Sequence, residues 1–420
     1  GMKFPLLVAG SLFSIFLLSI VVFASSSIPA FPLWDVITGT QDINNTNTGN
    51  VGIGVAQASA KLEVGGGIKL NPNGPKPLCN NRNERGIIWF TKSSDGDYLE
   101  LCRYNAEGKI TTLQNMLPTQ MGEHSCARSS ANNNFYCFGG FTIWSTAISN
   151  SIIKFDPTTN NITTQNATLP TPRFGLSCAE NSATKLIYCF GGNDGSVSTN
   201  QIIEYDPVLD TITTKSATLP TDTIRFSCTE NSQNHKIYCF GGEQSSAGIF
   251  LNRITEYDSI TDTLVTKNAT LPNPTRFLSC AENTSTQLIY CFGGAVTGTG
   301  AINQITEYNA NTDTLTIKSA VLPLPTIAPY CIEDNQNHNI YCYGGVNGNP
   351  LTDAIEKYDP NTDTIGTLQL TLPTPVSSTQ CMKDIQSNTI YCIGGADSTG
   401  YTNKIVKHQL NVLGWTKITN

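Results

Sequence analysis

Short stretches in which apolar and polar residues alternate recur along the chain, separated by turn residues. One set reads "RFGLSCAE" over 173–180, "KLIYCFGG" over 185–192, "NQIIEYDP" over 200–207 and "TITTKSAT" over 211–218. Alternation with a period of two predicts β-strands, and Gly-Gly and Asp-Pro predict the turns that separate them. These stretches therefore predict one antiparallel unit of four strands.

The double glycine that closes the second strand occurs six times. Successive copies are 52, 50, 52, 51 and 50 residues apart. The first glycines of the pairs are Gly139, Gly191, Gly241, Gly293, Gly344 and Gly394. Glycine suits a strand end that requires positive φ or a close backbone approach. A period near fifty residues with four strands per unit is typical of a β-propeller.

Twelve of the fourteen cysteines form six pairs, each with a separation of eleven positions. The pairs are Cys126–Cys137, Cys178–Cys189, Cys228–Cys239, Cys280–Cys291, Cys331–Cys342 and Cys381–Cys392. Polar turn residues lie between the two members, so the spacing predicts hairpins with opposed cysteines, about 4.5 Å apart at Cα and within disulfide range. Zinc is a rival interpretation, disfavoured because no Cys-x-x-Cys spacing occurs. Unpaired structural cysteines are the other alternative.

The unit resembles the kelch repeat, in which a strand ends in Gly-Gly and a Tyr-Asp-Pro follows. The tyrosine positions are Phe155, Tyr205, Tyr257, Tyr308, Tyr358 and His408. The family's tryptophan, seven positions later, becomes Ile162, Ile212, Leu264, Leu315 and Ile365, and the last unit alone keeps it, as Trp415. The resemblance implies an all-β fold, a six-bladed β-propeller of four-stranded antiparallel blades over 117–420.

The closure of the ring has two candidate strands. The sixth unit contains four strand-like segments of its own, which end in "NVLGWTKI". We therefore expect closure without a strand from the N-terminal side. Residues 102–118 nevertheless look like a worn third and fourth strand.

The N-terminal region predicts an export signal. Residues 5–24 are an uncharged apolar run of twenty residues, within an N-terminal segment 1–24. A cleaved signal peptide and a retained membrane anchor, as an apolar helix, both fit and stay open. Residues 25–48 are rich in Ser, Asn and Thr and predict a linker.

Residues 49–116 predict a small β stalk. Within them, 49–71 carries "VGIG" and resembles strand-turn-strand segments of phage tail fibres and bacterial surface proteins. We expect Cys79 and Cys102 to pair with each other.

Composition and the cysteines limit the partners and the location that we expect. Charged residues make up 14% of the chain, the net charge is −7 and no basic block occurs, which disfavours nucleic acid. Export and paired cysteines predict an extracellular, cell-surface location, secreted or membrane-anchored through 5–24. Candidate N-glycosylation sites, if the host glycosylates, are Asn44, Asn161, Asn166, Asn268 and Asn283.

The sequence offers no catalytic motif. HExxH, GxSxG and P-loop patterns are absent, and the histidines are His124, His235, His338 and His408. Galactose-oxidase-like members of the kelch fold bind copper with two His and two Tyr, and no matching cluster occurs. Sialate-mutarotase-like proteins share a six-bladed kelch ring, but no motif matches residue by residue. We therefore assign no catalytic residue, metal or cofactor.

Candidate ligand contacts lie in the loops. Arg173, Arg225 and Arg276 each precede a Phe between units and could bind an anionic ligand such as a uronic or sialic acid, or tie neighbouring blades. They lie five, three and four positions before the next cysteine, so they need not converge. Aromatic residues in the loops after Gly-Gly suit glycan or protein binding, or inward anchoring, and include Trp144, Phe250 and Tyr401.

The opposite face carries a second pattern. Glu180, Glu230, Glu282 and Glu333 each follow the first cysteine of their unit by two positions, and the remaining units have Arg128 and Lys383 there. A weak cation-binding rim and a solvated turn position both fit, and we favour the latter.

These observations predict an exported, non-catalytic binding or adhesion module on a stalk, with a glycan or a surface protein as ligand. A carbohydrate-active enzyme on the same ring is one alternative. A subunit of a pilus-like filament, self-associating through its N-terminal helix or stalk, is another.

Overall fold

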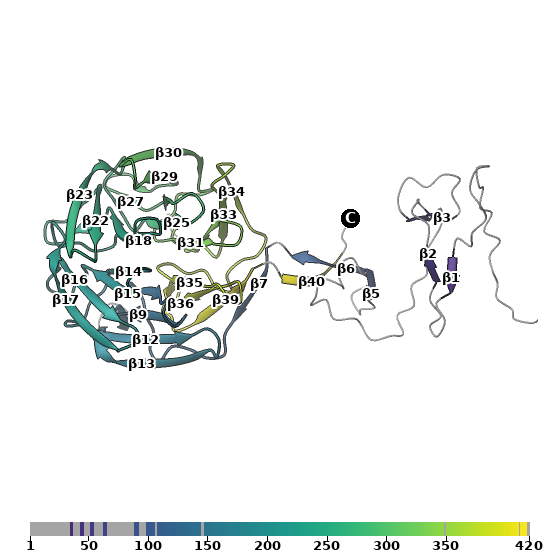
Figure 1. The fold of residues 1–420 in the computed structure, drawn as a ribbon, viewed down its shortest axis with the longest axis horizontal. Helices are drawn as coiled ribbons and strands as arrows, with labels where there is room; N and C mark the ends of the chain where they lie inside the picture. Colours follow the sequence, from purple (N-terminus) through teal and green to yellow (C-terminus); the bar gives the residue numbers. More distant parts are fainter. Residues whose placement is uncertain are drawn as a thin grey trace, which may run out of the picture. The chain divides into compact units, whose positions relative to one another are not determined.

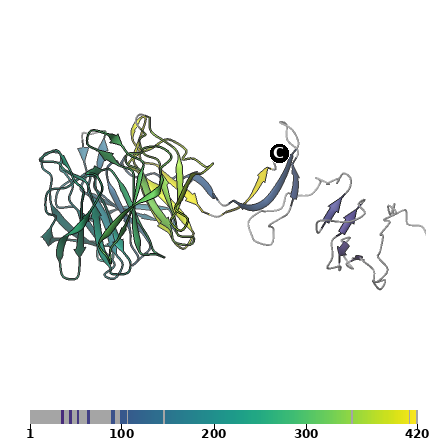
Figure 2. The same cartoon turned by 90° about the horizontal axis from the view of Figure 1, so that it is seen from above.

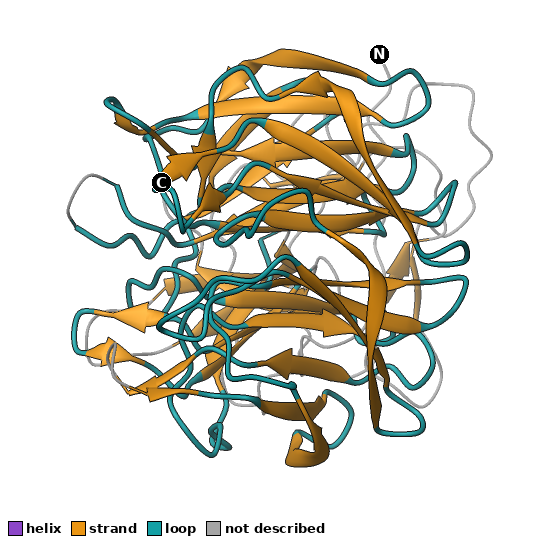
Figure 3. Ribbon diagram, turned by 90° about the vertical axis from the view of Figure 1, so that its left-hand side faces the viewer, coloured by secondary structure: helices purple, strands orange, loops and turns teal. Residues whose placement is uncertain are grey.

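In a computed structural model, residues 107–142, 147–347 and 350–410 are described with their side chains. Seven further strands are described by their backbone alone. All of these residues form strands, turns and loops, with no helix among them (Figure 3). Accordingly, no helix in this part of the chain has the length and hydropathy needed to span a bilayer. The expectations for the apolar segment 5–24 and the Cys79–Cys102 pair lie outside the described residues, and of the expected linker 25–48 only residues 34–36 and 43–45 are described.

The chain forms two compact units. The smaller comprises 1–77, 87–101 and 417–420, and the larger comprises 78–86 and 102–416. Three small sheets are described by their backbone alone. In the first, β1 (Trp34–Val36) is antiparallel to β2 (Ile43–Asn45), and in the second, β3 (Val51–Ile53) is parallel to β4 (Leu62–Val64). The third contains β5 (Ile88–Thr91), β6 (Tyr98–Asn105) and β40 (Val412–Lys417).

The larger unit contains six four-stranded antiparallel sheets, here called blades one to six. Blades one to three are β8 (Ser125–Arg128), β9 (Phe135–Phe138), β12 (Ser151–Asp156) and β13 (Asn161–Thr168); β14 (Ser177–Asn181), β15 (Leu186–Phe190), β16 (Gln201–Asp206) and β17 (Thr211–Thr218); and β18 (Ser227–Asn231), β19 (Lys236–Phe240), β22 (Arg253–Asp258) and β23 (Thr263–Thr270). Blades four to six are β25 (Ser279–Asn283), β26 (Leu288–Phe292), β29 (Gln304–Asn309) and β30 (Thr314–Val321); β31 (Tyr330–Asp334), β32 (Asn339–Tyr343), β33 (Ile355–Asp359) and β34 (Thr364–Thr367); and β35 (Gln380–Asp384), β36 (Thr389–Ile393), β39 (Ile405–Gln409) and β7 (Lys109–Thr112).

The blades form a closed ring (Figure 1). The first strand of each blade contacts the first strands of both neighbouring blades, and β35 of blade six contacts β8 of blade one. These first strands surround the axis, and the fourth strands form the outer wall (Figure 1). In the perpendicular view the strands run between the two faces of the ring (Figure 2).

We name the two faces by their connections. The Gly-Gly face carries the loops after each Gly-Gly pair and the loops between blades, and the turn face carries the turns between first and second and between third and fourth strands. Short extra strands on the Gly-Gly face are β10 (Phe141–Ile143) with β11 (Ala147–Ile148), β20 (Glu243–Gln244) with β21 (Ile249–Phe250), β24 (Thr275–Arg276) with β27 (Ala295–Val296) and β28 (Gly300–Ala301), and β37 (Ala396–Asp397) with β38 (Gly400–Tyr401).

The six predicted disulfides are confirmed. In each blade the two cysteines are directly opposed in the register of the first and second strands, as Cys178 is to Cys189, with Cα atoms 4.0 Å apart. The same holds for the other five pairs. The disulfides are buried between blades, where Cys178 and Cys189 pack with Tyr136 and Phe138 of the preceding blade. Each bridge therefore closes its own hairpin and also fills part of an interface.

Six clusters of buried residues lie at the six junctions between blades. At the junction of blades one and two, Phe138 meets Tyr205 edge to face, with centroids 5.4 Å apart. Equivalent Phe–Tyr pairs occur at the next three junctions. A single blade exposes two apolar faces, so its burial depends on both neighbours.

The Gly-Gly pairs have the geometry that the sequence predicts. Gly191 has φ +62°, and a Cβ there would lie 2.2 Å from the carbonyl oxygen of Thr223. The amide of Gly192 donates to that same carbonyl at 3.0 Å. The strand therefore ends where the next inter-blade loop crosses it, and a side chain would prevent this contact.

The expectation for ring closure is wrong. The fourth strand of blade six is β7, which comes from the N-terminal side and pairs with β39, whereas β40, with Trp415, lies beside β6. Ile110 therefore stands opposite His408, in the position that the sequence pattern assigns to Trp415. The carboxylate of Glu107 supports this arrangement by accepting hydrogen bonds from two amides of blade five at 3.1 Å.

Candidate ligand-binding site at the axial channel

The Gly-Gly face has a channel mouth built from one residue of each blade. The six residues, here called the mouth ring, are Glu123, Gly175, Arg225, Phe277, Ala328 and Ser378. All six have φ between +49° and +65°. From Gly175 to Ser378, each amide donates to the carbonyl of the preceding member, at 2.8–3.3 Å. These hydrogen bonds join the backbone of neighbouring blades around the mouth of the axial channel. A depression of about 100 Å³ lies at this end of the channel.

Charged side chains of the mouth ring form a connected network. Arg225 binds Glu123 with two hydrogen bonds, at 3.0 and 3.2 Å. Glu243, at the start of the loop after Gly-Gly in blade three, lies 3.5 Å from Arg225 and 2.5 Å from Arg276. All four side chains are partly exposed. Burial opposes the charge of Arg225, but Glu123 and then Glu243 outweigh it and raise the pKa of Arg225.

Aromatic rings alternate with these two arginines. The guanidinium of Arg225 lies 4.8 Å from the ring centroid of Phe277 and 5.8 Å from that of Phe174. Arg276 lies over Phe250 at 4.4 Å and near Phe277 at 5.4 Å. Stacking holds the two guanidinium planes against apolar surfaces, so their remaining donors keep a fixed direction.

The other half of the mouth is lined by small side chains. Blades five and six contribute Ala328 and Ser378 to the mouth ring. The loops after Gly-Gly on these two blades begin with Val346 and Ala396, which pair with Ile327 and Ser377 of the inter-blade loops. The mouth ring is therefore asymmetric, with charged and aromatic side chains on blades one, three and four and small side chains on blades five and six.

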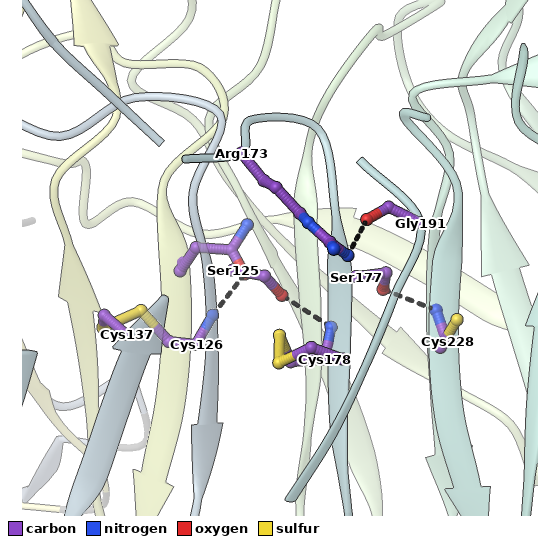
Figure 4. Close-up of a disulfide and its surroundings, with 10 residues drawn as sticks. Ser125, Cys126, Cys137, Arg173, Ser177, Cys178, Gly191 and Cys228 are labelled. Carbon is purple, nitrogen blue, oxygen red and sulfur yellow. Dashed lines mark hydrogen bonds between the residues drawn. A yellow bond between two sulfur atoms is a disulfide. The ribbon is translucent and has the colours of Figure 1, made fainter. Parts of the chain in front are cut away.

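The three predicted arginines do not converge. Arg225 and Arg276 share Glu243, whereas Arg173 is buried and donates to the carbonyl of Gly191 at 3.2 Å (Figure 4). Arg173 also donates to the side chain of Gln201. Burial lowers the pKa of Arg173 to about 10. The backbone amide of Arg173 donates to the carbonyl of Ser149 in blade one, so Arg173 ties two neighbouring blades, which is the alternative role left open by the sequence.

The predicted aromatic contacts differ among themselves. Phe250 packs on Arg276 and is half-buried. Tyr401 is buried and stacks on Phe141, with centroids 5.6 Å apart, so it is an inward anchor. Phe141 in turn lies 4.2 Å from Phe174, which connects this stack to the arginine network. Trp144 lies outside the described residues.

Inside the channel, neighbouring first strands are joined through serines. The hydroxyl of Ser125 accepts from the amide of Cys178 at 2.9 Å, and that of Ser177 accepts from the amide of Cys228 (Figure 4). The next two junctions repeat this bond, and Gln380 supplies it between blades six and one. In blade five Tyr330 takes the serine position and lines the channel toward both ends.

At the turn face, the residues two positions after each first cysteine form a second ring. The carboxylate oxygen Oε1 of each glutamate accepts from the turn of the preceding blade, as Glu282 does from the amide of Ser232 at 2.7 Å. Glu180, Glu230 and Glu333 repeat this contact. Glu282 and Glu333 are buried, which differs from the solvated turn position that we favour from the sequence. These carboxylates surround a cavity of about 290 Å³.

Burial sets the ionisation of this turn-face ring. It raises the pKa of Glu282 to about 7, against the hydrogen bonds from Ser232, and the charges of Glu230 and Glu333 add to the rise. Burial likewise raises the pKa of Glu180 to about 6, opposed by the hydrogen bonds from Ser130. Lys383 and Arg128 occupy the same ring on blades six and one.

The histidines form no shared site in the described part of the chain. His235 and His338 occupy matching turns and contact Glu230 and Glu333 through Nδ1 at 3.3 and 2.8 Å. His124 is buried between blades, and burial lowers its pKa to about 4. Within the described ranges one group, His124 with Cys126 and Cys137, has metal-ligand spacing, but its two sulfurs are bonded to each other. His408 binds Tyr343 and the carbonyl of Glu107.

The glycosylation candidates differ in exposure. Asn161, Asn166 and Asn268 are exposed on the outer strands β13 and β23. Asn283 is fully buried and donates to the carbonyl of His338 at 2.8 Å. Asn44 lies in β2, outside the residues whose side chains are described.

Sequence reasoning did not single out Glu123 or Glu243, and it noted Phe174 and Phe277 only as the residues that follow two of the arginines. A signal for two of them exists, because every mouth-ring residue lies three positions before the first cysteine of its blade. Aligning the six units on their cysteines groups Glu123 and Phe277 with Arg225. Glu243 and Phe174 are brought in by the bridges between inter-blade loops and the loops after Gly-Gly, which have no sequence signal.

Comparisons with known proteins concern the fold. Residues 336–364, which include the second and third strands of blade five, match a family model described as "Kelch motif". Many solved structures resemble the chain. One, described as the structure of YjhT, is 14% identical with a TM-score of 0.58, over 72% of this chain and 99% of that chain. No curated protein matches the sequence significantly.

Proposed function

We propose, from the premise that this chain is a kelch-repeat propeller, that it is an exported, non-catalytic binding module whose mouth ring binds a glycan. Six disulfides favour an oxidising, extracellular location. The fold itself indicates no activity, so the proposal depends on the site.

The network around Arg225 supports the proposal most directly. Two arginines and two glutamates neutralise one another, which disfavours a ligand that brings its own charge to this point. A neutral sugar instead offers hydroxyl groups, which accept from guanidinium donors and donate to carboxylates. Phe174, Phe250 and Phe277 supply apolar surface beside these polar groups, and such a combination is typical of small-molecule sites. The anionic sugar considered from the sequence is correspondingly less favoured.

The asymmetry of the mouth supports a ligand that enters from one side. The mouth-ring residues of blades five and six, Ala328 and Ser378, have small side chains. A glycan chain end fits this geometry, because a terminal sugar reaches the network while the following sugars lie over the small residues. A flat protein surface has no equivalent projection.

The test is a glycan-array screen of the purified chain, followed by calorimetry with the best ligand. Replacing Arg225 with Met should weaken binding about tenfold or more, as for a central charged contact. Lys215→Met is the matched control, because Lys215 is also a partly exposed cation paired with a glutamate, but on the outer strand β17. It should leave binding unchanged. Equal binding by the Arg225 variant would contradict the site, and a protein ligand without any glycan ligand would contradict the ligand class.

A carbohydrate-active enzyme on the same ring is the second candidate, and the raised pKa values of Glu180 and Glu282 favour it. A carboxyl that titrates near neutrality can transfer protons in catalysis. Against this role, each of these carboxylates already accepts hydrogen bonds from a neighbouring turn. Incubating the chain with its array ligands and analysing products by mass spectrometry distinguishes the two, because any turnover contradicts the non-catalytic proposal.

A further inference from the structure

The junction between blades five and six contains a buried amine and a buried carboxyl in contact. Nζ of Lys383, on β35, pairs with Oδ1 of Asp334, on β31, and it also binds Oδ1 of Asn388 at 2.6 Å. Lys383 is 5% exposed and Asp334 is fully buried. The other oxygen of Asp334, Oδ2, is buried and has no hydrogen-bond partner among the described residues.

This environment disfavours two separate charges. Taking an ammonium and a carboxylate out of water is expensive unless every polar atom is satisfied, and Oδ2 of Asp334 is not. Burial lowers the pKa of Lys383, although Asp334 opposes that shift. Transfer of one proton from Nζ to Oδ1, along their contact, gives a neutral amine beside a neutral carboxylic acid.

We propose that Lys383 and Asp334 condense to an isopeptide bond that links blade six to blade five covalently. The lone pair of Nζ attacks Cγ of Asp334, a C–N bond forms, and the Cγ–Oδ2 bond breaks. Oδ2 leaves as water and takes two protons, the one first transferred to Oδ1 and a second one from Nζ. The overall change converts an ammonium and a carboxylate into an amide and one water, and it requires no co-reactant.

The contact between Nζ and the carboxyl group favours the reaction by raising their effective concentration. Two groups held in contact by rigid strands react with an effective concentration far above that of free solutes. Oδ1 of Asn388 accepts a hydrogen bond from Nζ and so orients the nitrogen, and the amide of Gln336 donates to Oδ1 of Asp334 at 3.2 Å. The oxygen that leaves is therefore the one without a donor. Tyr341, also buried with an unpartnered hydroxyl, adds to the dry surroundings.

The location fits a covalent reinforcement, because this junction lacks contacts that the others have. Tyr330 replaces the serine whose hydroxyl accepts from the next cysteine amide at the first four junctions. The outer strand of blade five, β34, has four residues, whereas those of blades one to four have eight. Blade six also receives β7 from the N-terminal side, so a pull on that side acts first on this blade.

The test is the intact mass of the purified full chain after reduction, alkylation and denaturation. We expect the mass to be one water below that of the alkylated sequence. Proteolysis should yield one branched peptide that joins the segments around residues 334 and 383, with no tryptic cleavage after Lys383. The junction of blades six and one is an internal control, since Arg128 holds the place of Lys383 there and a guanidinium does not condense in this way.

Two variants complete the design. Lys383→Arg retains the charge and Lys383→Met retains only the apolar stem, and both should have the full alkylated mass. A wild-type chain of full mass, with Lys383 and Asp334 in separate unmodified peptides, would overturn the proposal. The mass of the wild-type chain decides even if both variants fail to fold. The inference is independent of the mouth ring, so the result for the cross-link neither supports nor contradicts glycan binding.

Discussion

Glu282 lies between Glu230 and Glu333 in the turn-face ring, and burial together with these two charges favours the protonated form of its carboxyl. Its folded pKa, about 7, exceeds the value of 4.5 for a free glutamate. The folded state therefore holds a proton between these two pH values that the unfolded state releases. Stability from this group is fully present below about pH 4.5 and declines as pH rises toward 7.

We expect Glu282→Gln to raise the thermal midpoint at pH 7.5 and to flatten its pH dependence between pH 5 and 7. The neutral amide keeps an oxygen that accepts from Ser232 and removes the buried charge. The effect at pH 7.5 should be on the order of 1–3 kcal/mol. Scanning calorimetry across this pH range measures it. Glu307→Gln, at a salt-bridged glutamate on β29, is the control and should not stabilise. An unchanged pH profile would mean that Glu282 is not the titrating group.

Single residues also show what the sequence could and could not reveal. In blades two to four the first strand ends in an asparagine that donates to a carbonyl of the next blade, as Asn231 does to Gln287. The first strand of blade five instead ends in Asp334, and the next blade has Lys383 where blades two to five have glutamate. The paired change from Asn and Glu to Asp and Lys is visible once the units are aligned. Its burial and the unpartnered Oδ2 are not, because they depend on packing between blades.

Among the elements, the strands of each blade follow from the alternation pattern, but ring closure does not. Both β7 and β40 have suitable strand patterns, and local sequence does not distinguish them. In the structure, His408 of β39 makes contacts that favour β7 as the closing strand. Its Nε2 is 2.6 Å from the carbonyl of Glu107, which can only accept, so Nδ1 accepts from Tyr343. The histidine thus joins the turn before β7 to blade five, a contact without any periodic signature.

We expect removal of residues 109–112 to abolish cooperative unfolding, because it opens blade six. A chain that ends after Leu410, and so lacks β40, should keep its thermal midpoint within a few degrees. Circular dichroism melting of both chains provides the comparison. If the shortened C-terminus were the more damaging change, β40 would be the closing strand in solution.

The disulfides make a separate prediction at this scale. Replacing Cys178 and Cys189 together with Ala should lower the free energy of unfolding by about 2–4 kcal/mol, since each bridge closes a short hairpin and fills an interface. Urea denaturation measures this loss. Removing the Cys280–Cys291 pair as well should give an additive loss, because the two hairpins share no interface. A loss well above the sum would show that the blades respond as one network.

For the whole molecule, the repeat predicts the ring and its two faces, but the asymmetry of the Gly-Gly face comes from the side chains of individual blades. The six units share spacing, cysteines and glycines, and these determine the scaffold. Glu123 and Glu243 join the arginines only because the loops of blades one to three meet across the mouth. Sequence position alone therefore could not identify which arginines act together.

Glycosylation provides a test at this scale. In a host that glycosylates, we expect glycans at Asn161, Asn166 and Asn268, which lie on the outer wall, and none at the buried Asn283. Mass spectrometry before and after glycosidase treatment locates them. Ligand binding at the mouth should be the same with and without these glycans. A glycan on Asn283 would mean that modification precedes folding of blade four.

The mouth ring separates two tasks that proteins often assign to the same atoms. Its backbone amides and carbonyls hold neighbouring blades together, and its side chains take no part in those bonds. Six different amino acids occupy the six positions. New recognition properties can therefore arise by point substitutions there without loss of the architecture, much as antibody loops diversify on a constant framework. A library randomised at these positions would be a practical source of disulfide-braced binders.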